Sequence, residues 1–147
     1  MSDDDSVAKE LVETLKDGER GFATAAEKLQ DSDRAEWATT LRQLSTQRAD
    51  FTKEIVDLGH RYGEDVDESG TVAGALHRGW ISLKDALTGD DAGAVLAAAV
   101  TGENHAVSEY EKALEKDLSA GFREVVTRQH AAVVAARDQV EGLREAG

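Results

Sequence analysis

The 147-residue chain contains no cysteine and no proline, and only 5% of its residues are aromatic. The absence of cysteine excludes disulfide bonds, thiol nucleophiles and thiolate metal ligands. The absence of proline removes the residue that most strongly interrupts helices, while alanine, glutamate and leucine, which favour helices, are abundant. We therefore predict an all-α protein that forms a single domain over residues 1–147.

Basic residues are also scarce, because the chain has 17 lysines and arginines but 30 aspartates and glutamates, for a net charge of −13. This charge repels the phosphates of nucleic acids and of anionic lipids. No segment approaches the roughly 20 apolar residues that cross a bilayer, and no basic stretch followed by an apolar run opens the chain. We therefore expect a cytoplasmic protein that binds neither nucleic acids nor membranes.

Apolar residues recur at intervals of three and four residues, a spacing that places them on one face of a helix. The acidic residues 1–5 are expected to fray, and Asp33 with Glu36 forms a capping-box pattern. The first two helices are joined tightly, as are the last two, so each pair is expected to form an antiparallel hairpin. The predicted helices span residues 6–30, 33–62, 71–88, 91–117 and 120–145.

The stretch from Ser69 to Gly89 joins the two hairpins. A helix of about 17 residues there covers roughly 26 Å, which with the preceding loop returns the chain along the bundle. Helices 33–62 and 91–117 would then run parallel, as in ferritin-like four-helix bundles with one long crossover. His77 and Arg78 are expected to hold this connector against the bundle, and Trp80 to act as a core anchor.

Two glycines, Gly18 and Gly21, lie inside the first predicted helix. In a helix interior, each glycine lowers the stability of the helix by about 1 kcal/mol relative to alanine. We therefore predict that another part of the chain approaches the helix backbone closely at this position.

Polar side chains interrupt the apolar stripes at one depth of the predicted bundle. Glu19 and Glu103, for example, each have apolar residues seven positions before and after them. The rise of about 1.5 Å per residue places the interrupting residues of four helices at similar depths. Since buried charge is costly unless it is paired, this polar layer is the candidate functional site. Its members are Glu19, Gln47, Arg48, Asp50, Glu103, Gln129 and His130.

The segments DGERGF (17–22), GALHRGW (74–80), ALTG (86–89), GEN (102–104) and RQH (128–130) give the chain a family resemblance. It resembles short bacterial four-helix-bundle proteins of the ferritin-like superfamily, a domain of unknown function with some members loosely linked to stress. The resemblance implies an all-α, ferritin-like antiparallel bundle. In the wider superfamily a di-iron centre takes one glutamate from each of two helices and a Glu-x-x-His pair from each of the other two.

One hypothesis for the polar layer is therefore a metal site that binds iron or manganese and supports oxidation or peroxide removal. Glu19 and Glu103 match the two single-glutamate positions of the resemblance. Gln47 and Thr127 stand where the other two glutamates are expected, which removes negative charge that would neutralise two cations. The expected ligands are Glu19, Asp50, Glu103 and His130.

The other hypothesis is an internal ion-pair network in place of the metal, in which Arg48, with Arg137, pairs with Glu19 and Glu103. We favour this second hypothesis, which predicts a non-enzymatic bundle protein without a cofactor, with a homodimer as one expected assembly. The sequence contains no nucleophile beside a base, no phosphate-binding loop and no cofactor fingerprint, so we assign no catalytic residue.

Overall fold

The computed structural model describes residues 3–61 and 78–146, without the side chains of residues 60, 61 and 78. This part of the chain contains helices and turns but no strand, so the all-α prediction is confirmed. None of its helices is both long and apolar enough to cross a membrane. The elements are α1 (Asp4–Gln30), α2 (Ala35–Arg61), the 3-10 turn η1 (Arg78–Trp80), α3 (Ser82–Ala86), α4 (Ala92–Leu114) and α5 (Ala120–Ala146).

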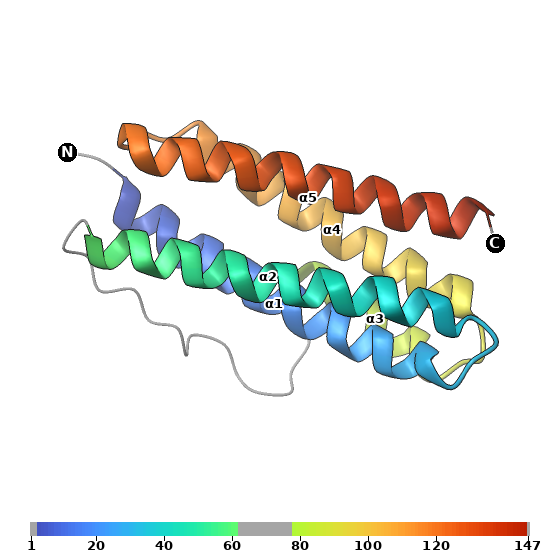
Figure 1. Cartoon of the computed structure of the whole chain (residues 1–147). Coiled ribbons are helices and arrows are strands. Elements are labelled where there is room, and N and C mark those ends of the chain that lie inside the picture. The colour runs from blue at the N-terminus through green and yellow to red at the C-terminus, as the bar shows by residue number, and fades with distance from the viewer. Residues whose placement is uncertain (1–2, 62–77, 147) are drawn as a thin grey trace.

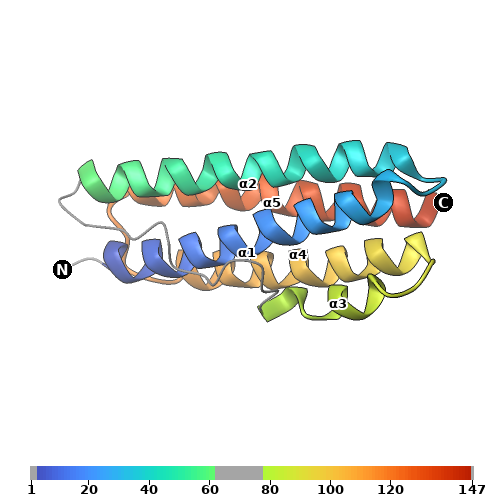
Figure 2. The same cartoon turned by 90° about the horizontal axis from the view of Figure 1, so that it is seen from below.

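The four long helices lie side by side, with α1 and α2 forming one antiparallel pair and α4 and α5 the other (Figure 1). Helices α2 and α4 run in the same direction, while α1 and α5 run in the opposite one (Figure 2). The chain between α2 and α4 therefore begins at one end of the bundle and α4 begins at the other.

The helix ends differ from the sequence prediction by a few residues because side chains intervene. Helix α2 begins at Ala35 rather than at residue 33, since the Ser32 hydroxyl accepts a hydrogen bond from the Arg34 amide and extends the turn. Helix α4 ends at Leu114 rather than near residue 117. The carbonyl of Leu114 accepts a hydrogen bond from the Arg123 guanidinium at 2.9 Å.

Of the residues expected to fray at the N-terminus, Asp3 and Asp4 are instead hydrogen-bonded to the α4–α5 turn. The Asp4 carboxylate accepts hydrogen bonds from the amide and the hydroxyl of Ser119, at 2.9 and 2.6 Å. The Asp3 amide donates to the carbonyl of Asp117 at 2.6 Å. Asp4, which is only 6% exposed, thus stabilises the start of α5 from another helix.

The buried apolar residues form two separate clusters, one at each end of the bundle. The first joins the early part of α1 to the late part of α2, the late part of α4 and the early part of α5. The second joins the late part of α1 to the early parts of α2 and α4, the end of α5, Trp80 and Leu83. Between the two clusters lies a layer in which the buried side chains of α2 and α4 include Arg48 and Glu103.

The prediction of one continuous helix over residues 71–88 is wrong for its described part. The chain forms η1, turns at Ile81 and then forms the five-residue helix α3. A β-carbon on Gly79 would stand 2.4 Å from the β-carbon of His105 on α4, so the chain winds directly onto that helix. We call Gly79–Leu87 the strap; residues 71–77, including His77, and the side chain of Arg78 lie outside the described residues.

Trp80 fastens the strap to the bundle. Its side chain is 2% exposed and lies between the backbones of α1 and α4. A β-carbon on Gly21 or on Gly102 would stand 2.3 Å from a ring carbon of Trp80, which leaves no room for any side chain at either position. The predicted close approach to α1 is therefore confirmed, and the ring of Phe22 adds an edge contact at 4.9 Å between centroids.

Alanine substitutions at the glycines test this packing. We expect Gly102→Ala to lower the free energy of unfolding by about 1–3 kcal/mol through overpacking against Trp80. The control is Gly142→Ala on α5, because a β-carbon there meets nothing within 4 Å. That variant should gain up to about 1 kcal/mol from helix propensity. Urea unfolding of both variants measures the difference, and a shift of the same sign in both would contradict the close contact.

Candidate functional site

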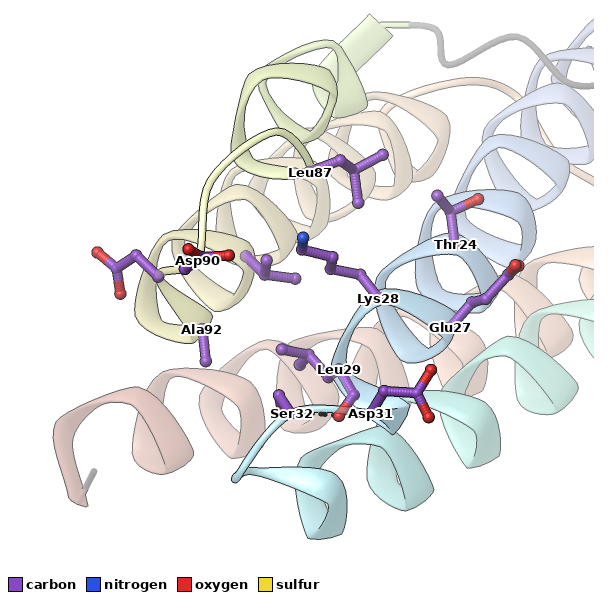
Figure 3. Close-up of a pocket in the computed structure, with 11 residues that line it drawn as sticks. Thr24, Glu27, Lys28, Leu29, Asp31, Ser32, Leu87, Asp90 and Ala92 are labelled. Carbon is purple, nitrogen blue, oxygen red and sulfur yellow. Dashed lines mark hydrogen bonds between the residues drawn. The ribbon is translucent and has the colours of Figure 1, made fainter.

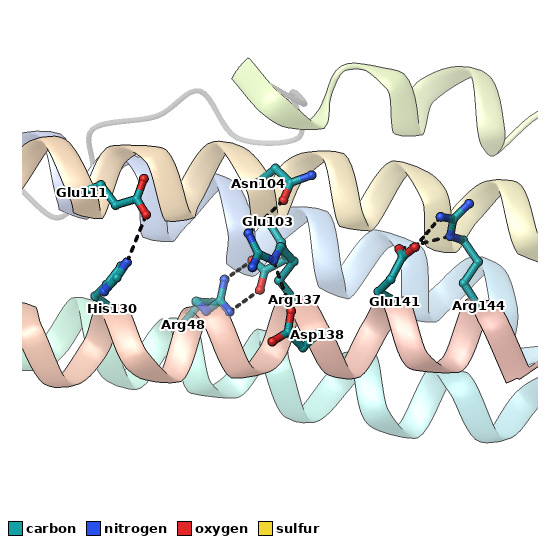
Figure 4. A network of polar contacts seen from close by, with 9 residues as sticks. All are labelled: Arg48, Glu103, Asn104, Glu111, His130, Arg137, Asp138, Glu141 and Arg144. Carbon is teal, nitrogen blue, oxygen red and sulfur yellow. Dashed lines mark hydrogen bonds and ion pairs between the residues drawn. The ribbon is translucent and has the colours of Figure 1, made fainter.

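The centre of the polar layer is an ion pair between Arg48 of α2 and Glu103 of α4 (Figure 4). The two nitrogens Nη1 and Nη2 of Arg48 donate to the two carboxylate oxygens of Glu103 at 2.5 and 2.7 Å. Arg48 is 1% exposed and Glu103 0% exposed. The geometry is the bidentate one in which a guanidinium satisfies a carboxylate most completely.

Neighbouring residues hold the Arg48 side chain in place. Its Nε donates to the side-chain oxygen of Gln47 at 3.1 Å, and its guanidinium carbon lies 5.2 Å from the centroid of the Phe22 ring. Gly18 of α1 lies against this side chain, since a β-carbon there would be in ordinary van der Waals contact with Nη1 of Arg48, at 3.5 Å. Gly18, the first of the two α1 glycines singled out in the sequence, thus borders the ion pair.

Glu19, expected to share this layer, lies elsewhere. It is half-buried and lines a groove at the surface between α1 and α2, beside Lys16 and Ser45. The Ser45 hydroxyl donates to the backbone carbonyl of Glu19 at 2.8 Å. At this depth of the bundle α1 buries the carboxylate of Asp17, at 3% exposure, which the sequence analysis did not select.

The remaining members of the expected layer are likewise dispersed. Asp50 is exposed and Gln47 is half-buried. His130 is half-buried with Nε2 3.7 Å from a carboxylate oxygen of Glu111, and Arg137 contacts Asp138 and Asn104 at 3.4 Å (Figure 4). The four expected metal ligands therefore do not converge. In the described part of the chain no three histidine, aspartate or glutamate side chains are grouped so as to hold a metal ion.

A second polar network, buried at Tyr110 and Gln129 and reaching the surface at Glu54, lies next to the ion pair on the side of the first apolar cluster. The Tyr110 hydroxyl donates to the side-chain oxygen of Gln129 at 2.7 Å, and the amide nitrogen of Gln129 donates to the Glu54 carboxylate at 2.8 Å. Glu54 also pairs with Arg128. Of this network the sequence analysis selected only Gln129, because Tyr110 fits the apolar stripe of its helix and Glu54 gives no sign that it faces inward.

The Tyr110 phenol is shielded from water. Burial raises the pKa of Tyr110 far above its usual value, the charge of Arg48 lowers that pKa, and the charges of Glu103 and Glu54 raise it further. The folded protein therefore keeps the Tyr110 proton at a pH at which the unfolded chain, with a tyrosine pKa of about 10, loses it.

This difference predicts alkaline destabilisation that depends on Tyr110. Above about pH 10 the unfolded state releases a proton that the folded state retains, so stability should fall by about 1.4 kcal/mol per pH unit. Tyr110→Phe should lower the free energy of unfolding by about 1–2 kcal/mol at pH 7, because the side-chain oxygen of Gln129 loses its hydrogen-bond donor. Since the variant has no phenol at position 110, its stability should fall less steeply above about pH 10 than that of the wild-type protein. Unfolding by urea from pH 8 to pH 11 measures both slopes, and equal slopes would contradict the prediction.

A cavity of about 580 Å³ lies at the end of the bundle near the α1–α2 turn (Figure 3). Lys28 extends into it from α1, and Asp90 stands on the side of the α3–α4 turn. The carboxylate of Asp91 at its rim is already the N-cap of α4, since it accepts a hydrogen bond from the Gly93 amide at 2.9 Å. The cavity is thus an open depression with mixed charges at its rim.

These observations define the class of the protein: it is an all-α protein whose described residues form four long helices with a fully buried ion pair and an inserted tryptophan. The chain belongs to the family described as a domain of unknown function (DUF2383), whose model matches residues 6–116. The match contains Arg48, Glu103 and Trp80 with its two glycines, and it ends before α5. A comparison with curated proteins finds no match.

Proposed function

We propose that the protein is a non-enzymatic bundle of the ferritin-like type, in which the Arg48–Glu103 ion pair stands in place of a metal centre. The observation that carries the proposal is that both oxygens of the fully buried Glu103 carboxylate bind one guanidinium. The parallel course of α2 and α4, separated by one long connection, supports the ferritin-like assignment (Figure 1).

The charges in the layer favour the ion pair over a cation. The pair of a carboxylate and a guanidinium has no net charge with which to neutralise a metal ion, and the guanidinium repels a cation at short range. The residues that would complete a ligand set face elsewhere, since Glu19 lines a surface groove and Asp50 is exposed. The ion pair then has a structural role, and the protein acts through its surface, in the stress setting that the resemblance suggests.

Metal analysis tests this proposal. Protein purified from cells supplied with iron and manganese should contain neither metal in stoichiometric amount and should oxidise ferrous iron no faster than buffer does. The comparison variant is Glu103→Gln, which removes the central carboxylate charge. Stoichiometric iron or manganese in the wild-type protein that is lost in the variant would contradict the proposal.

A further inference from the structure

We draw no further inference here: the strongest candidate, the cavity between α1 and the α3–α4 turn into which Lys28 extends, is an open surface depression whose polar side chains are all exposed or half-buried, and nothing in the described residues points to a ligand that it would hold.

Discussion

Replacement of Arg48 by methionine is expected to lower the free energy of unfolding by about 3–5 kcal/mol. The substitution keeps most of the side-chain volume but leaves the Glu103 carboxylate, which is 0% exposed, without its two charged hydrogen bonds. An uncompensated buried charge is among the most destabilising changes that a single substitution makes. Urea unfolding at pH 7 measures the loss.

Two control variants separate the buried charge from the general loss of an arginine. The double variant Arg48→Met with Glu103→Leu removes both charges and should recover most of the stability, since apolar replacements of buried pairs are often neutral. Arg144→Met breaks an exposed pair with Glu141 on α5 and should change stability little. A loss at Arg48 no larger than that at Arg144 would contradict the buried ion pair.

Replacement of Trp80 by alanine is expected to cost about 3–5 kcal/mol, as is usual for a large aromatic side chain removed from a core. The space that Trp80 occupies between Gly21 and Gly102 cannot close, because the rest of the bundle holds α1 and α4 apart. The control on the same strap is Ile81→Ala. It should change the free energy of unfolding by no more than about 0.5 kcal/mol, because Ile81 is 62% exposed. Thermal unfolding monitored by circular dichroism compares the two, and similar losses would show that Trp80 does not anchor the strap.

Much of the helical architecture could be predicted from the sequence. The apolar spacing identified all four long helices, with ends wrong by a few residues, and the glycines at 18 and 21 indicated a close approach to α1. The described part of the connector, residues 78–89, could not be predicted, because the same apolar spacing is met by two short helical turns wound onto α4. What decides between these conformations is the docking of Trp80 against two glycines that lie 81 positions apart in the chain.

The candidate site was predictable only in part for a similar reason. The structure contains the Arg48–Glu103 contact of the ion-pair hypothesis, while Glu19 lies in a surface groove. A seven-residue spacing drifts by about 20° per repeat around a straight helix, so it does not separate the centre of a buried stripe from its edge. The inward side of α1 at this depth carries Asp17 and Gly18 instead, and Arg48 fills the space beside Gly18.

The division of the apolar core into two clusters has a consequence for how the helices align. Most side chains of the two clusters are aliphatic, and aliphatic packing alone would tolerate a shift of α2 along α4 by one turn, about 5.4 Å, more readily than a pair of specific polar contacts does. Such a shift would place Arg48 and Glu103 each against apolar neighbours, so that both buried charges would be left without a partner. The ion pair therefore fixes the register of the two hairpins, and this selection of one alignment matters even if the pair adds little net stability.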